Sequence, residues 1–507
     1  MTATTIETPS PQSAPAPDEA VAAYSHRQIM TIMSGLMLGM LLAVLDQTII
    51  STALTRISED FHRPDLYSWV VTSYLLTSTA STPLYGKLGD LYGRKKIFQI
   101  AIVIFLLGSA LAGLSQSMIQ LIIFRGVQGL GAGGLISLAL AIVGDVISPR
   151  ERGRYQGYFG AMFAASSILG PLIGGFLVDQ ASWRWVFYVN IPVGIVALIV
   201  IRRVLTIDYA RRTARLDIFG ALLLVGGVSL FLIAVQDAGQ QARITQTIFI
   251  VAIAGLALIV GFAGWEKRAA EPILPPRLFG NAVFRVTSTL SLITGAIMFG
   301  AIIFMPQYLQ LVRGSSPTLS GLRLLPLLAG MLITSVGSGR LVTKLGRYKI
   351  FIIAGTGVMT AGMALLTLIR VGTNGWLLSA MLFVVGFGLG LFIQNTVLAT
   401  QNSVDIADLG TATSAVTFLR TLGGAVGASS LGAIIIAYQR SHVAGDIERY
   451  GPHAGPLVTF THGMDHAYLW TVPIGLAAFV LSFFMRELNL RTTAATSART
   501  ATAEPAA

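Results

Sequence analysis

Charged residues are scarce in this chain of 507 residues, where they make up 11% of the sequence, against roughly 25% in an ordinary soluble domain. Hydrophobic residues make up 54%. A soluble protein of this size needs more polar side chains to cover its surface. Lipid must therefore cover much of this one, and the composition predicts a membrane protein.

Cysteine is absent altogether, which excludes disulfides, thiolate zinc sites and thiol catalysis. A phosphate-binding loop of the form G-x-x-x-x-G-K-[ST] is absent as well, so ATP is not the expected energy source. We expect an ion gradient in its place, and no cofactor. No catalytic constellation supports an enzyme. The net charge of +12 is spread over short loops, which does not predict nucleic-acid binding.

Long apolar runs are abundant. A helix that crosses a bilayer core of about 30 Å needs about 20 mainly apolar residues, and the chain contains fourteen such runs. They are continuous rather than alternating, so strands are not expected, and the predicted fold class is an all-α polytopic membrane protein. The runs lie at residues 28–51, 68–88, 97–115, 118–141, 155–179, 184–204, 217–236, 246–265, 284–311, 318–339, 349–370, 375–399, 411–437 and 467–486.

Basic residues between the runs predict the topology. If the N-terminus is inside, the inner loops hold twenty Lys and Arg residues and the outer loops hold few. The positive-inside rule then places both termini in the cytoplasm, and an even number of spans agrees. We expect a monomeric, multi-pass protein of the inner or plasma membrane. Residues 1–27 and 487–507 are rich in Ala and Thr and predict disordered cytoplasmic tails.

An internal repeat divides the chain. Residues 86–94 read G-K-L-G-D-L-Y-G-R, and residues 339–347 read G-R-L-V-T-K-L-G-R. If two central spans are an insertion, each copy follows the second span of a six-span half. Such parallel repeats are the architecture of the major facilitator superfamily. The predicted units are an N-terminal half, two linker spans and a C-terminal half, at residues 28–204, 205–283 and 284–486.

The first copy of the repeat resembles the loop motif of that superfamily, G-x-L-x-D-x-x-G-R-[KR]. Residues 125–131 resemble its fourth-span motif, R-x-x-Q-G-x-G. Residues 166–175 resemble its antiporter motif, G-x-x-x-G-P-x-x-G-G, with Ser166 at the first glycine. Residues 45–50, 183–192 and 306–310 resemble motifs of the fourteen-span drug:proton antiporters of the EmrB/QacA type. The resemblance implies export rather than import.

Asp46 and Arg125 are the candidate proton-coupling residues. Asp46 lies deep in the first apolar run, where a carboxylate costs about 3 kcal/mol, and burial disfavours its charged form. It is therefore a candidate to bind a proton from the outer side and release it inside. Arg125 lies in the fourth run, and the resemblance implies that it lowers the proton affinity of the acid. A permanent ion pair and a hydrogen-bonding hub are the structural alternatives.

The motif after the second span is interpreted as a conformational latch. Gly86 and Gly93 permit a tight turn and close helix approach. Asp90 can lie at the N-terminus of the thirteenth span, where the helix dipole favours an anion. Arg94 can pair with Asp145. These contacts would hold the cytoplasmic side shut, whereas Lys95 and Lys96 are expected only to anchor the topology.

Three further sets of residues are candidates. The antiporter motif predicts a kink and tight packing in the fifth span, and amides near the membrane centre are candidate cavity residues or interhelical hydrogen bonds. His462 and His466 have a spacing that suits zinc, but no metal site is predicted. The kink residues are Gly170, Pro171, Gly174 and Gly175, and the cavity amides are Gln47, Gln128, Gln307, Gln310, Gln394 and Asn395.

Proton-coupled efflux of small lipophilic compounds is the function predicted from these features. The ninth to twelfth spans contain no mid-membrane acid, so the expected substrates are hydrophobic or monocationic. A dedicated exporter of one metabolite, lipid or siderophore, a proton-coupled importer, and a non-transporting sensor remain alternatives. The coupling ion can be sodium instead of the proton. Arg420, in the thirteenth span, receives no role.

Overall fold

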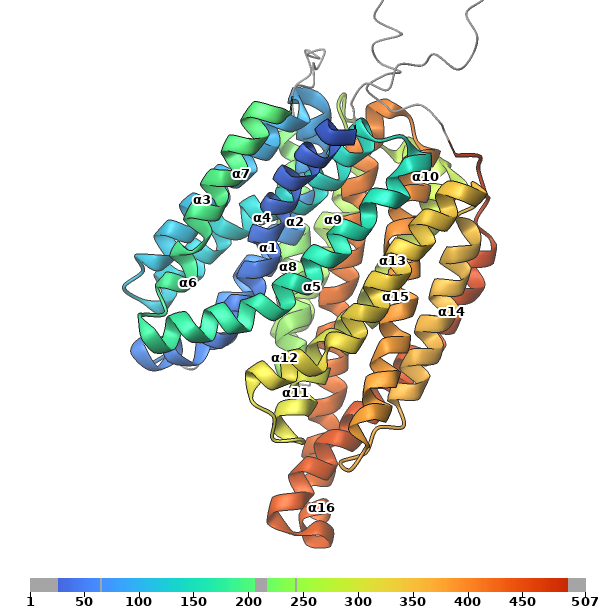
Figure 1. Ribbon diagram of the computed structural model, residues 1–507. Helices are drawn as coiled ribbons and strands as arrows, with labels where there is room; N and C mark the ends of the chain where they lie inside the picture. Colours follow the sequence, from blue (N-terminus) through green and yellow to red (C-terminus); the bar gives the residue numbers. More distant parts are fainter. Residues whose placement is uncertain (1–25, 64–65, 206–216, 242–243, 491–507) are drawn as a thin grey trace, which may run out of the picture.

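The computed structural model describes residues 26–63, 66–205, 217–241 and 244–490. The predicted tails and part of the segment that precedes the linker spans lie outside these residues. Every long element is a helix, and the helices form two bundles that lie side by side (Figure 1). In the described part of the chain, eleven helices are long and apolar enough to cross a membrane.

The N-terminal bundle contains seven helices. Two apolar clusters form its core, one among α1, α2, α3, α4, α5 and α7 and the other around the outer part of α1 and Trp183. The predicted sixth span corresponds to one candidate span, Trp185–Val204, in which α6 and α7 meet at Val189, whose backbone angles are helical. The helices are α1 (His26–Asp60), α2 (Tyr67–Tyr92), α3 (Arg94–Gly113), α4 (Met118–Val146), α5 (Pro149–Gln180), α6 (Trp185–Tyr188) and α7 (Asn190–Val204).

The linker pair consists of α8 (Ile218–Gln241) and α9 (Gln246–Trp265). An apolar cluster joins α8 to α2 and α16, whereas α9 packs mainly on α8. Most of the apolar surface of α9 is exposed, including Phe249, Ile253 and Val260. In a membrane, lipid covers such a surface.

The C-terminal bundle has one large apolar core. Its last helix, α16, is 75 residues long and contains Gly451 with a φ of 86°, where two helices meet. The segment 438–466, which the sequence suggested as an outer connection, is therefore helical, and it extends beyond the bundle (Figure 1). The elements are α10 (Pro276–Gly280), α11 (Ala282–Leu311), α12 (Pro317–Arg323), α13 (Leu325–Leu345), α14 (Lys349–Leu366), α15 (Gly375–Ser403), the 3-10 turn η2 (Ile406–Asp408) and α16 (Leu409–Phe483).

Two glycines with positive φ mark the internal repeat in the structure. Gly93 follows α2 with a φ of 91°, and Gly346 follows α13 with a φ of 70°. Gly93 precedes Arg94, the first residue of α3, and Gly346 precedes Arg347, which lies two residues before the start of α14. Glycine adopts such angles without a steric cost, so a glycine with positive φ ends the second long helix of each bundle, although the two turns differ in ψ.

The described chain begins and ends at the same end of the molecule (Figure 1). The α2–α3 turn and the start of α16 lie at this end too. Here hydrogen bonds join the two bundles, as described below, and we call it the closed end.

Candidate functional site

A buried polar cluster surrounds Asp46 in the N-terminal bundle. Its carboxylate accepts hydrogen bonds from Arg125 Nη1 at 2.5 Å, Gln128 Nε2 at 2.8 Å and Asn190 Nδ2 at 3.0 Å. Arg125 Nη1 also donates to Gln128 Oε1 at 2.7 Å. All four residues have no exposed surface. The cluster joins α1, α4 and the first residue of α7.

Neighbouring groups fix the cluster in position. The guanidinium of Arg125 lies over the Tyr74 ring, 4.2 Å from its centroid, and the Tyr74 hydroxyl donates to the carbonyl of Ala43. Asn190 also donates to Ser109 Oγ at 3.0 Å. Close helix approach makes this possible, because a Cβ at Gly108 would meet the backbone nitrogen of Gln128. These contacts hold Arg125 and Asp46 in one geometry.

The chemistry of the cluster follows from its charges. A buried ion pair is tolerable only while both partners are charged, since the loss of one leaves the other uncompensated. In the described part of the chain, Arg125 Nη2 and Asn190 Oδ1 are buried without a hydrogen-bond partner. A proton on Asp46 would cancel the charge that compensates Arg125. The pair is thus suited to couple a protonation to a rearrangement of helices.

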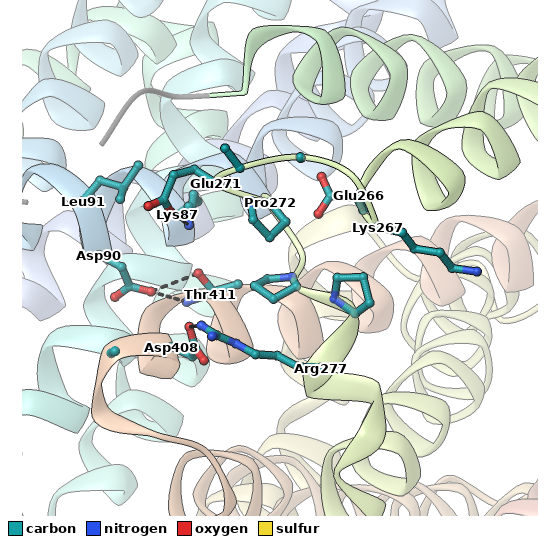
Figure 2. Close-up of a pocket in the computed structure, with 15 residues that line it drawn as sticks. Lys87, Asp90, Leu91, Glu266, Lys267, Glu271, Pro272, Arg277, Asp408 and Thr411 are labelled. Atoms are coloured by element: carbon teal, nitrogen blue, oxygen red, sulfur yellow. Dashed lines mark hydrogen bonds and ion pairs between the residues drawn. The ribbon is translucent and has the colours of Figure 1, made fainter. Parts of the chain in front are cut away.

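Asp90 ties the two bundles together at the closed end. It accepts hydrogen bonds from the backbone nitrogens of Gly410 at 3.2 Å and Thr411 at 2.7 Å, and from the Thr411 hydroxyl at 3.0 Å (Figure 2). The Asp90 carboxylate, on α2, thus lies against the first turn of α16, where the helix dipole favours an anion. Arg94 lies between Asp90, at 2.6 Å, and Asp145, at 2.7 Å. Asp90, Arg94 and Asp145 therefore form one chain of charges.

A second connection between the bundles was not foreseen from the sequence. Arg152, on α5, is buried and donates to Gln401 Oε1 of α15 at 2.6 Å and to the carbonyls of Ile147 and Gly144. The Gln401 amide in turn donates to the carbonyl of Leu140 at 3.1 Å. Sequence reasoning grouped Arg152 with the topology-setting bases, because a loop arginine that becomes buried gives no local signal.

The segment between α9 and α11 crosses the closed end. Glu266 accepts hydrogen bonds from the backbone of Ile273 and Leu274, at 3.1 and 2.8 Å. Glu271 pairs with Lys87 at 2.7 Å, and Arg277 pairs with Asp408 at 2.9 Å. Figure 2 shows these side chains around a hollow of about 560 Å³ that Asp90 and Thr411 also line. We call residues 266–277 the strap.

Comparison with known proteins accounts for this architecture. The family model of the Major Facilitator Superfamily matches residues 36–428. This chain belongs to the major facilitator superfamily. The multidrug transporter protein MdtP of Bacillus subtilis is 38% identical over 408 residues, which cover 80% of this chain and 75% of MdtP. The efflux pump FUS6 of Gibberella moniliformis is 31% identical over 491 residues, which cover 89% of this chain and 86% of the pump.

A solved structure agrees on the fold. The crystal structure of the human organic anion transporter MFSD10 superposes with a TM-score of 0.64 over 89% of this chain and 99% of that one. The two sequences are 17% identical, so the likeness concerns the fold alone. As a member of this superfamily, the chain is a membrane-embedded transporter of small molecules, and its efflux relatives support drug export.

In this transporter, the residues of the antiporter motif lie on α5 against α1. A Cβ at Gly170 would meet the Thr48 side chain, and Thr48 Oγ1 donates to the carbonyl of Ser166 at 3.1 Å. Gly174 is buried, whereas a Cβ at Gly175 would meet nothing within 4 Å. The side chain of Pro171 lies outside the described part of the structure. The motif therefore places α1 and α5 in close contact.

The six predicted cavity amides lie in different surroundings. Gln128 belongs to the Asp46 cluster. Gln47, Gln307 and Gln310 are exposed, and Gln310 donates to Ser320. Asn395 is buried and donates to Ser338 Oγ and to its own helix. Gln394 is buried, and its Oε1 has no hydrogen-bond partner among the described residues. The amides thus do not form one group.

The outer histidines lie on the helical extension of α16. His442 stacks on Tyr438 with the ring centroids 4.1 Å apart, and His462 and His466 border a hollow that also holds the Arg370–Asp465 ion pair. Among the described residues, no group of three or more His, Cys, Asp and Glu side chains could hold a metal ion.

Asn190 is the contact of Asp46 that sequence reasoning missed. It stands in the stretch W-R-W-V-F-Y-V-N-I-P, which was used only as a mark of resemblance. An asparagine inside an apolar run is a usable signal, because a buried amide needs partners. Tyr74 and Ser109 gave no such signal, since hydroxyls are common in spanning helices.

Proposed function

We propose that this transporter is a fourteen-span drug:proton antiporter that expels small lipophilic compounds by alternating access. The buried ion pair between Asp46 and Arg125 is the observation that carries the proposal. A proton that reaches Asp46 releases Arg125 from it, and the freed guanidinium must find other acceptors. Protonation would thereby shift the balance between two arrangements of the bundles.

The span count of fourteen is supported by helix length. Besides the eleven apolar helices, α2 has 26 residues and α5 has 32, more than the roughly 20 needed to cross a bilayer. At about 1.5 Å per residue, α16 exceeds three bilayer thicknesses in contour length and changes direction at Gly451. It can supply two spans. We place the closed end in the cytoplasm, because its loops carry most of the basic residues.

The transport cycle follows from the two sites. The Asp90 and Arg152 connections hold the cytoplasmic side shut while Asp46 takes up a proton from outside. The connections then part, the compound enters from the cytoplasm, and Asp46 releases its proton there. Energy comes from the proton gradient, without a cofactor. The compound and the proton compete for binding in the arrangement that is open to the cytoplasm. The protein therefore carries one or the other, which makes the exchange obligatory.

Asp46→Asn tests the coupling in proteoliposomes with an imposed pH gradient, with a neutral lipophilic dye such as Nile red as the transported compound. The variant should lose gradient-driven transport and the proton flux that accompanies it, while the protein still inserts and folds. Asp237→Asn makes the same chemical change in the linker helix α8 and should transport normally. Gradient-driven transport at the wild-type rate by Asp46→Asn would remove Asp46 from the mechanism.

A further inference from the structure

Arg420 is a membrane-embedded cation without a counter-charge. It lies on α16, eleven residues from the start of the helix at Leu409, or about 16 Å along the helix axis. That is close to half of a bilayer core of about 30 Å. In the described residues, nothing forms a hydrogen bond or an ion pair with its guanidinium, and the side chain is half-buried.

The nearest intramembrane acids are engaged or distant. Asp46 is held by Arg125, Gln128 and Asn190. Asp237, on α8, is next to Gln236, which accepts a hydrogen bond from Ser429 of α16. Residue 429 is nine positions beyond Arg420, or about 14 Å along the helix. Neither acid therefore neutralises Arg420.

Helical periodicity shows which way Arg420 faces. Thr413 contacts Gln401 of α15 at 3.0 Å, where Arg152 closes the pathway between the bundles. Arg420 follows Thr413 by seven residues, so it lies on the same face two turns farther from the closed end. The opposite face of α16 packs on α8 through Leu422 and Ala425. The side of α16 that carries Arg420 packs on α11 through Gly424 and Gly427. Arg420 thus lies beside α11, on the side of α16 away from α8.

Gln394 reaches the same level from the neighbouring helix. It precedes Gln401 on α15 by seven residues, and α15 runs toward the closed end, so Gln394 also lies two turns beyond the Gln401–Thr413 contact. Its Oε1 is buried without a hydrogen-bond partner in the described part of the chain. A cation and an amide oxygen, both without a partner in the described part of the chain, therefore lie at one depth.

We infer that Arg420 binds the transported compound directly and that the preferred substrates are lipophilic organic anions, such as aromatic carboxylates. The inference rests on the proposed efflux function and reverses the charge expected from the sequence. An unpaired guanidinium in the membrane repels cations, and it supplies donors that match the geometry of a carboxylate.

Binding to the purified full-length protein tests the inference with matched fluorescent probes, 1-pyrenebutyrate and its neutral methyl ester. The wild-type protein should bind the carboxylate more tightly than the ester. Arg420→Gln should weaken carboxylate binding at least about tenfold, because a charge-assisted hydrogen bond is lost, and should leave ester binding unchanged. Arg420→Lys should retain part of the preference. Arg340→Gln, which removes an exposed positive charge of α13, should change neither.

Two results would overturn the inference. One is a wild-type protein that does not prefer the carboxylate, and the other is an Arg420→Gln variant that binds both probes as before or loses both equally. A folding defect is separable, because removing an uncompensated buried charge should leave the thermal midpoint unchanged or raise it. If the protein binds the carboxylate through Arg420 but liposomes do not transport it, the efflux proposal fails and the binding site stands.

Discussion

Gly86 is the position where a single methyl group should open the closed end. A Cβ at Gly86, on α2, would lie 2.5 Å from Ser414 Oγ and 2.8 Å from the carbonyl oxygen of Gly410, both on α16. The clash lies between the bundles, so Gly86→Ala should destabilise only the arrangement in which they touch. Overpacking typically costs about 1–3 kcal/mol, which shifts the ratio of open to closed molecules about 5- to 150-fold.

Cysteine labelling can measure this shift, because the natural chain has no cysteine. Thr417 is buried and lies on the central face of α16, four residues beyond Thr413. In Thr417→Cys, a membrane-impermeant maleimide should reach the thiol from the cytoplasm only when the closed end has opened. Inverted vesicles present that side to the reagent. Adding Gly86→Ala should raise the labelling rate about 5- to 150-fold and should slow transport.

Gly261→Ala is the matched control. Gly261 is also in a helix, and a Cβ there would meet nothing within 4 Å, so the variant gains the same helix propensity without a clash. The double variant Thr417→Cys with Gly261→Ala should label at the rate of Thr417→Cys alone. If Gly86→Ala also labels at that rate while remaining folded, the two bundles do not meet at Gly86, and the closed end is held otherwise.

Two further predictions concern the strap. Glu271→Lys should repel Lys87 and slow transport, and the exchanged pair Lys87→Glu with Glu271→Lys should recover a coupling on the order of 1 kcal/mol in a double-mutant cycle; additive losses would show that the pair does not act across the strap. Burial raises the pKa of the Glu266 carboxyl, and the hydrogen bonds from Leu274 and Ile273 partly offset the effect. Because the folded-state pKa lies above the unfolded one, the stability that a protonated Glu266 contributes is present below its ordinary pKa and is lost as pH rises through the raised value. The thermal midpoint of the wild-type protein in detergent should therefore fall with pH relative to that of Glu266→Gln, and a constant difference would contradict this.

The helical fold was predictable because it depends on composition and run length. Apolar runs located most helices, and the repeated G-[KR]-L-x-x-x-x-G-R segment located the two turns that end in Gly93 and Gly346. Helix ends and breaks were not predictable. The helical form of residues 438–466 was missed because this stretch is mostly polar, and a search for apolar runs does not report a polar helix.

Asp46, Arg125, Asp90 and Arg94 were identifiable because a charge in an apolar run, or in a repeated motif, is conspicuous. Arg152 and Glu271 were not, because each lies in a polar stretch where charges are ordinary. Arg152 matters because it is buried at the contact between the bundles, and Glu271 matters because it pairs with Lys87. Gln128 was conspicuous in the sequence, but its role was not predictable. A glutamine can line a cavity or bind a neighbouring side chain, and only the structure places it beside Asp46.

The two direct connections between the bundles, at Asp90 and at Arg152, can open without stranding a charge. Across the bundles, each residue forms hydrogen bonds only with neutral groups. Asp90 accepts from the first turn of α16, and Arg152 donates to the side-chain amide of Gln401. Their charged or carbonyl partners, Arg94 for Asp90 and Gly144 for Arg152, belong to the same bundle and remain in contact when the bundles part. A salt bridge across the bundles would leave two bare ions on opening, at a cost of several kcal/mol per ion. Hydrogen bonds to neutral groups are exchanged for water at a net cost of about 0.5–3 kcal/mol each. A gate of this kind stays shut when undisturbed, yet a change of a few kcal/mol is enough to release it.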